Sequence, residues 1–251
     1  MNPIIPEWPV PDCVKAFSTL RDGGFSLSPY HGGISGTGGL NFGLHVGDDP
    51  VKVRENRALL KKMLPSEPVW LNQIHGVNVV DAAKCAGAPD ADASYTSAKN
   101  VVCVVMTADC LPVLLCASDG MVVASVHAGW RGLVAGVLEK AVEAVRKISD
   151  SEIMAWLGPA IGPDAFEVGE DVKIAFVRKD RRMSAAFKRN ETRDGKYLAD
   201  IYALARQILN GVGIVRIYGG DFCTVSDPGR FYSYRRDGVT GRMATGIWIA
   251  S

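Results

Sequence analysis

Three short apolar runs near the middle of the chain constrain its fold more than any other feature. They are VVCVVM (101–106), LPVLLC (111–116) and MVVASVH (121–127), and breaking residues separate each run from the next. Apolar runs of this length, rich in valine and leucine, are typical of strands that are buried on both faces. We therefore predict a sheet that other elements cover on both sides.

Helical patterns surround these runs. Asp49 and Pro50 stand where a cap and a first helical residue are favoured, so we predict a helix over about 50–64. Apolar residues recur at helical spacing over 131–148. Further helices are expected over 168–177 and 197–210, the latter stopped by Gly211.

The remaining apolar stretches indicate additional strands. We expect a strand pair at 69–75 and 77–82 on either side of Gly76, and single strands at 154–157, 214–218 and 243–249. Hairpin-like strands mixed with helices predict an α+β fold of sheets covered by helices. No linker or repeat divides the chain, so we predict a single domain over 1–251.

The charge and cysteine content narrow the classes of function. Lys and Arg number 28 and Asp and Glu 27, with no block of like charge, so no nucleic-acid surface is indicated. The sequence contains no run of 18 apolar residues, so no membrane span is expected. The proline-rich start does not resemble a secretory signal. The six cysteines form no C-x-x-C pair, which favours a reduced cytoplasmic protein.

Two of the four histidines, His75 and His127, stand at the ends of expected strands, and Cys110 stands at a similar boundary. Imidazole and thiolate are the usual zinc ligands, and three protein ligands with one open position describe a catalytic site. The wide spacing of the three residues is not specific. A buried histidine and an inert core cysteine remain the alternative interpretation.

Other residues are candidates for proton transfer or anion binding. Asp109, Glu167 and Asp221 could act as acids or bases, or simply accept backbone N–H groups. Gly129 and Arg131 introduce the helix expected from 131, where free N–H groups could hold phosphate with help from the guanidinium. The glycine-rich stretch 31–43 lacks a P-loop pattern, so we expect a flexible loop or lid there.

Taken together, several stretches resemble the YfiH-like family, which has carried a laccase or polyphenol oxidase label. The matching stretches span nearly the whole chain and are FSTLRDGGFS (17–26), LNFGLHVGDDP with RENR (40–57), WLNQIHG (70–76), TADCLPVLL (107–115), VHAGWRG (126–132), LGPAIGPDAFEVG (157–169) and FYSYRRDGVTGRMA (231–244).

The resemblance implies a four-layer α-β-β-α sandwich with mixed sheets and a zinc site formed by His75, Cys110 and His127. It also implies phosphorolysis of adenosine, inosine, guanosine and methylthioadenosine, with phosphate as co-substrate, and deamination of adenosine. His45 and Arg57 fall in matched stretches and are expected in the pocket. Arg131 or Arg235 would neutralise the phosphate, and Asp109 or Glu167 would move the proton.

Two rival chemistries stay open at this point. A multicopper oxidase needs roughly ten histidines for its ligands, and this chain has 4. A single copper ion bound in place of zinc remains an alternative, as in a phenol oxidase. The other rival is a metal-free cysteine hydrolase, with Cys110 as nucleophile and His127 or His75 as base.

Overall fold

The computed structural model describes residues 2–33 and 38–251. Its main element is a mixed sheet of six strands, in which β12–β8 and β3–β4 pair in parallel and the other neighbours are antiparallel. In order across the sheet, these are β12 (Arg216–Gly219), β8 (Ile153–Leu157), β6 (Leu111–Ala117), β7 (Val123–Ala128), β4 (Ala93–Thr96) and β3 (Val79–Asp81).

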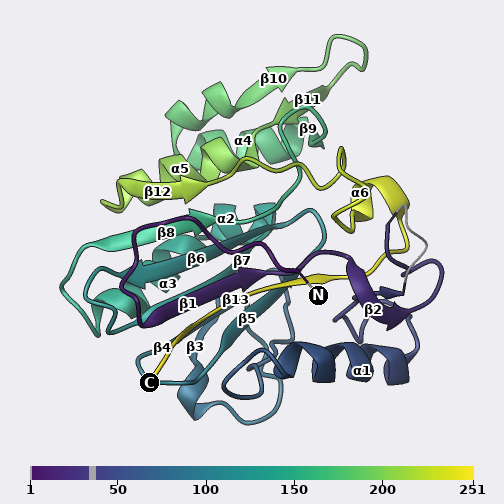
Figure 1. Cartoon of the computed structure of the whole chain (residues 1–251). Coiled ribbons are helices and arrows are strands. Elements are labelled where there is room, and N and C mark those ends of the chain that lie inside the picture. The colour runs from purple at the N-terminus through teal and green to yellow at the C-terminus, as the bar shows by residue number, and fades with distance from the viewer. Residues whose placement is uncertain (1, 34–37) are drawn as a thin grey trace.

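A second, antiparallel sheet packs against one face of the first (Figure 1). It contains β1 (Val14–Ser18), β13 (Met243–Ile249) and β5 (Cys103–Thr107). Side chains alternate along β6: Leu114 joins the cluster that includes Ile247 of the second sheet, whereas Val113 joins the cluster formed with the helices. The apolar runs are therefore buried on both faces, as their composition predicts.

Helices cover the two outer faces. On the six-stranded sheet lie α2 (Trp130–Ala135), α3 (Val137–Arg146), α4 (Glu170–Lys179) and α5 (Ile201–Gly211). On the other side, α1 (Pro50–Lys61) inserts Leu60 into a cluster with Val104 and Met106 of β5. The layers thus run helix, sheet, sheet, helix, and this mixed α+β arrangement confirms the predicted fold class.

The smaller elements lie at the periphery. A three-stranded antiparallel sheet, the strand β2 and three short helices complete the described chain: β9 (Glu167–Gly169), β10 (Phe187–Arg189), β11 (Lys196–Ala199), β2 (Asp22–Ser26), η1 (Ala82–Lys84), η2 (Arg181–Ala186) and α6 (Tyr234–Asp237). In Figure 1 the small sheet lies at the top with α4, and α6 lies to the right.

The helix expected over 131–148 is in fact two helices. Gly136 adopts a left-handed conformation, with φ of 105°, and it ends α2 and precedes α3. Two carbonyl groups near the end of α2, those of Leu133 and Val134, accept hydrogen bonds from Lys179 Nζ at 3.1 Å. The break is stable because a glycine tolerates the backbone angle and a lysine satisfies exposed carbonyls.

The expected strand pair 69–75 and 77–82 is also wrong. The first segment makes isolated bridges, from Val69 to Cys103 and from Asn72 to Asp90, whereas Val79–Asp81 pairs in parallel with β4. His75 has a φ of 57°, which interrupts an extended strand. Residues 197–199 belong to β11, and the following helix begins at Ile201, because the Asp200 side chain caps it.

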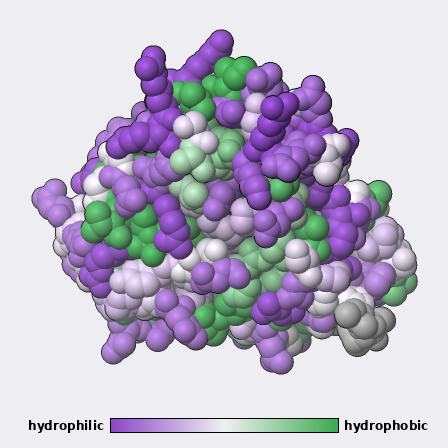
Figure 2. All heavy atoms as spheres, turned by 90° about the horizontal axis from the view of Figure 1, so that it is seen from above, coloured by the Kyte–Doolittle hydropathy of each residue, from purple (hydrophilic) through white to green (hydrophobic). Residues whose placement is uncertain are grey.

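Two further expectations concern the loop and the membrane. The glycine-rich loop or lid expected over 31–43 includes residues 34–37, which lie outside the described residues. None of the described helices is long and apolar enough to cross a bilayer. On the face shown in Figure 2, apolar residues form separate patches among hydrophilic ones.

Candidate active site

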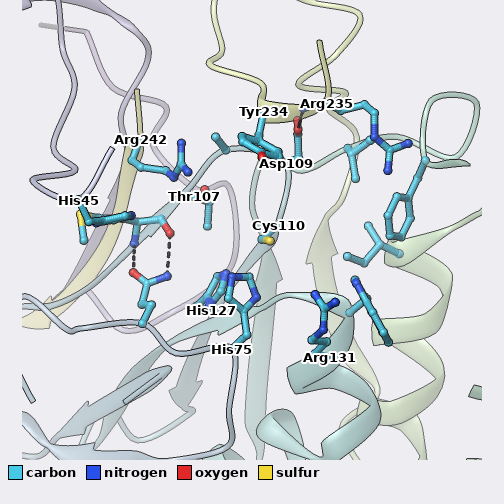
Figure 3. Close-up of a pocket in the computed structure, with 17 residues that line it drawn as sticks. His45, His75, Thr107, Asp109, Cys110, His127, Arg131, Tyr234, Arg235 and Arg242 are labelled. Carbon is cyan, nitrogen blue, oxygen red and sulfur yellow. Dashed lines mark hydrogen bonds between the residues drawn. The ribbon is translucent and has the colours of Figure 1, made fainter. Parts of the chain in front are cut away.

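The fold brings His75, Cys110 and His127 together at one point. Cys110 ends the short connection from β5 to β6, and His127 lies in β7, where it faces Pro112 of β6. One nitrogen of each imidazole and the Cys110 sulfur lie within 4.8 Å of one another. Figure 3 shows the cysteine above the two histidine rings, with all three side chains at the floor of a pocket.

Gly129 leaves room for this convergence. A Cβ atom at Gly129 would stand 2.9 Å from His75 Nδ1 and 3.3 Å from Cys110 Sγ. Any larger residue would therefore push the candidate ligands apart. Gly76 has no such role, because a Cβ there would meet its neighbours at ordinary contact distances of 3.5 Å or more.

A carboxylate that we did not predict, Asp92, organises the two histidines. It is fully buried, and its Oδ1 accepts a hydrogen bond from His127 Nδ1 at 2.7 Å. The same side chain accepts the backbone N–H groups of His75 at 2.9 Å and Gly76 at 2.6 Å. Asp92 therefore fixes the turn that carries His75 and leaves His127 Nε2 as the coordinating nitrogen.

The protonation equilibria reflect this network. Burial opposes charge on His127, but hydrogen bonds with Asp92 and Cys110 outweigh it and raise its pKa to about 9. Desolvation and the neighbouring His127 lower the pKa of His75. Burial would raise the pKa of Asp92, but hydrogen bonds from His127 and Gly76 hold it below its ordinary value. The buried Asp92–His127 pair is thus a carboxylate beside a readily protonated imidazole.

The donor set fits a metal ion. Two imidazoles and one thiolate are a ligand combination of catalytic zinc sites, and copper accepts the same donors. A carboxylate bonded to the second nitrogen of a ligating histidine is the usual outer support of such a centre, and Asp92 occupies that position. Among the described residues, His75, Cys110 and His127 form the one group of at least three closely placed donors.

Above these residues lies a pocket of about 530 Å³. Three aromatic rings line it, those of Trp130, Phe166 and Tyr234. Its charged lining comprises Asp109 and the three arginines 131, 235 and 242. Apolar walls with a few convergent polar groups are typical of small-molecule sites. The combination of aromatic faces and guanidinium groups suits a ligand with both a planar ring and an anionic group.

Asp109 enters the pocket from a strained position, with a φ of 85°. Both of its carboxylate oxygens already have donors: Thr224 Oγ1 reaches Oδ1 at 2.6 Å, and the backbone N–H of Arg235 reaches Oδ2 at 2.6 Å. The side chain therefore connects the β5–β6 turn, which carries Cys110, to the start of α6.

Of the other residues expected in the pocket, some line it and others do not. His45, Arg131 and Arg235 line the pocket, on different sides of Cys110 in Figure 3. Desolvation and the nearby Arg242 lower the pKa of His45. The Arg131 guanidinium stacks 4.5 Å from the Trp130 ring centre. Because α2 has only six residues, its start offers a weaker helix dipole than the long helix we expected.

Arg57, Glu167 and Asp221 are not among the residues that line the pocket. Arg57 stacks on Trp70 and donates to the Phe42 carbonyl oxygen, and burial lowers its pKa to about 10. Glu167 accepts hydrogen bonds from Arg193 at 2.7 Å and Asn190 at 2.8 Å. The structure therefore places Asp109, and not Glu167, near the candidate ligands.

Comparison with known proteins adds a family assignment to this geometry. Residues 15–250 match the family model described as multi-copper polyphenol oxidoreductase laccase. Proteins named purine nucleoside phosphorylase YfiH, from Escherichia coli and Shigella flexneri, are each 52% identical to the chain over 98% of both lengths. The crystal structure of a Neisseria meningitidis protein, 48% identical, superposes over 100% of both chains with a TM-score of 0.92.

Proposed function

The chain belongs to the multi-copper polyphenol oxidoreductase laccase family, and we propose that it is a zinc-dependent purine nucleoside phosphorylase that also deaminates adenosine. The observation that carries the proposal is the placement of His75, Cys110 and His127 at the floor of a pocket with aromatic and arginine walls. Relatives named purine nucleoside phosphorylase, half identical over nearly the whole chain, support this reaction class.

The residues of the pocket match the parts of the substrates. The rings of Trp130, Phe166 and Tyr234 offer faces on which a purine can stack. The arginines supply donors for phosphate, the second substrate of phosphorolysis. We propose adenosine, inosine, guanosine and methylthioadenosine as nucleosides, because the expected chemistry takes place at the ribose carbon that all four share.

The metal would be held by His75, Cys110 and His127, with Asp92 orienting His127. A bound zinc ion supplies Lewis acidity at the coordination position that the protein leaves open. Copper can substitute at these donors. The protein's own contribution is to hold the nucleoside and phosphate together, which lowers the entropic part of the barrier. We place the enzyme in the cytoplasm, because all six cysteines are unpaired thiols.

One observation favours a second candidate, the metal-free cysteine hydrolase. Asp92 is hydrogen-bonded to His127, and the sulfur of Cys110 lies within 4.8 Å of a nitrogen of that ring, an order that resembles the orienting acid, base and nucleophile of a catalytic triad. His75, whose ring centre lies 4.7 Å from that of His127, has no role in such a triad, whereas it completes a metal site. We therefore retain the zinc phosphorylase as the proposal.

Metal removal and replacement test the proposal. We expect the chelated protein to lose phosphorolysis of inosine and one equivalent of Zn²⁺ per chain to restore it. Three protein ligands would leave the ion one coordination position for a reactant. Copper-loaded protein that oxidises phenols but does not split inosine would favour the phenol oxidase. Full turnover by chelated protein would overturn the zinc proposal and favour the cysteine hydrolase.

Substitution of Asp109 tests whether its carboxylate moves a proton. In Asp109→Asn, the amide can accept from the Arg235 N–H and donate to the Thr224 hydroxyl, so both connections are retained. If Asp109 is the acid or base, this variant should lose roughly a hundredfold or more in rate, the usual contribution of a positioned proton donor or acceptor. Near-normal rates in Asp109→Asn, with loss in Asp109→Ala, would show that Asp109 only positions the turn and α6.

A further inference from the structure

Arg242 is a half-buried cation that is attracted by Asp109 across the pocket but, among the described residues, is paired directly with no carboxylate. It precedes β13 and lines the pocket. Among the residues that the structure describes, no ion pair involves Arg242, and only its Nη1 makes side-chain hydrogen bonds, to the carbonyls of Thr240 and Gly241 at 3.1 Å. Removing a guanidinium group from water without an opposite charge is costly. Such a group is suited to an anion that enters the pocket.

The surroundings of Arg242 hold it in place. The fully buried Asn41 accepts the backbone N–H of Arg242 at 2.8 Å and that of Gly43 at 2.9 Å. Its amide nitrogen donates to Asp48 at 2.8 Å, which secures the loop that carries His45. A Cβ on Gly43 would come within 2.9 Å of Arg242 Cγ, so the glycine makes room for the arginine stem. The Asn41 side chain therefore fixes the loop and the backbone of Arg242 relative to each other.

The direction of the side chain agrees with a binding role. In Figure 3 the Arg242 guanidinium extends toward Thr107 and Tyr234, on the same side of the pocket as His45. It lies 5.9 Å from the centre of the Tyr234 ring. Nε and Nη2 of an arginine form a planar fork that matches two oxygens of a phosphate.

The other two arginines of the pocket are less favourable. Arg131 is exposed and stacks on Trp130. Arg235 is also exposed, and its Nη1 donates to the Ala165 carbonyl oxygen at 3.3 Å. Exposed charges are screened by water and salt, whereas a partly buried charge acts more strongly on a ligand.

From these contacts we propose that Arg242 is the principal binding residue for the phosphate co-substrate. This assignment rests on the proposed phosphorylase function. It differs from the sequence-based expectation, in which Arg131 or Arg235 has that role. Phosphate would lie on the side of the pocket formed by Arg242 and His45, and the nucleoside would occupy the side with Trp130 and Phe166.

Two measurements on zinc-loaded protein test the assignment: calorimetric titration with inorganic phosphate, and the KM for phosphate in inosine phosphorolysis. In Arg242→Gln, the Kd and the KM for phosphate should both rise by roughly ten- to a hundredfold, since charge-assisted hydrogen bonds are lost. Arg242→Lys should lose less, because it keeps the charge without the fork. Adenosine deamination, which consumes no phosphate, should change less than either. Arg178→Gln removes the same charge from an exposed site on α4 and should leave all three measurements unchanged.

The outcomes separate the assignment from the function. Unchanged phosphate binding in Arg242→Gln and Arg242→Lys, with phosphorolysis intact, would overturn the role of Arg242 and leave the phosphorylase standing. Phosphate binding that depends on Arg242 in a protein that does not split inosine would support the anion site and overturn the phosphorylase. A failure of Arg242→Gln to fold would appear in its thermal melting, and Arg242→Lys would then decide.

Discussion

Cys110→Ala is expected to lose most of its bound metal and to slow inosine phosphorolysis by about a thousandfold or more. A metal ion contributes several kcal/mol to the stabilisation of developing charge, and each 1.36 kcal/mol corresponds to a tenfold change in rate. The thiol is at the pocket floor and only partly buried, so its removal should disturb the fold little. Elemental analysis measures the metal loss, and initial rates with inosine and saturating phosphate measure the loss of activity.

A matched control separates the pocket thiol from a general effect of cysteine loss. Cys85 is also partly buried, but its thiol donates to the Asp81 carbonyl oxygen and is not part of the pocket lining. Cys85→Ala should keep metal and activity. Full metal occupancy in Cys110→Ala would contradict the assignment of this residue as a ligand.

Asp92→Ala is expected to have the largest effect on stability and a strong effect on metal affinity. The substitution leaves the backbone N–H groups of His75 and Gly76 and the ring of His127 without their buried acceptor. Breaking a buried charged pair of this kind costs about 3–5 kcal/mol. The loss of an outer support of a ligating histidine lowers metal affinity by about ten- to a hundredfold.

Asp92→Asn refines the test. The amide has nearly the same volume, but its NH₂ group must face at least one of the donors that the carboxylate now accepts. We expect metal affinity to fall in this variant even where it folds, as competition with a chelator of known affinity would measure. Asp90→Asn, at an exposed neighbouring position, is the control. An unchanged metal affinity in Asp92→Asn would mean that His127 does not depend on Asp92.

The sequence predicts the central strands of the two packed sheets well because their signal is local. The three apolar runs correspond to β5, β6 and β7, and the Asp49 side chain caps α1 by accepting the N–H of Val51. The antiparallel pairing of β6 with β7 then explains why Cys110 and His127 meet: the start of one strand lies beside the end of the other. Residue type and strand boundary together were enough to select these two candidates.

What the sequence could not predict depends on contacts between distant segments. The positive φ of His75 is maintained by Asp92, which follows it by 17 residues (92 − 75), and no short pattern connects the two. Arg242 meets the loop that carries His45 only because Asn41 holds both backbones. Arg57 was expected in the pocket, but its helix packs on the outer face of the second sheet, where the side chain stacks on Trp70.

Product analysis of inosine with and without phosphate tests the central claim most directly. Zinc-loaded protein should yield hypoxanthine and ribose 1-phosphate only when phosphate is supplied, whereas adenosine should be deaminated in either buffer, since water is the second reactant there. Nucleoside cleavage that gives free ribose, or that proceeds equally without phosphate, would contradict a phosphorylase whose pocket holds phosphate between the candidate metal ligands and Arg242.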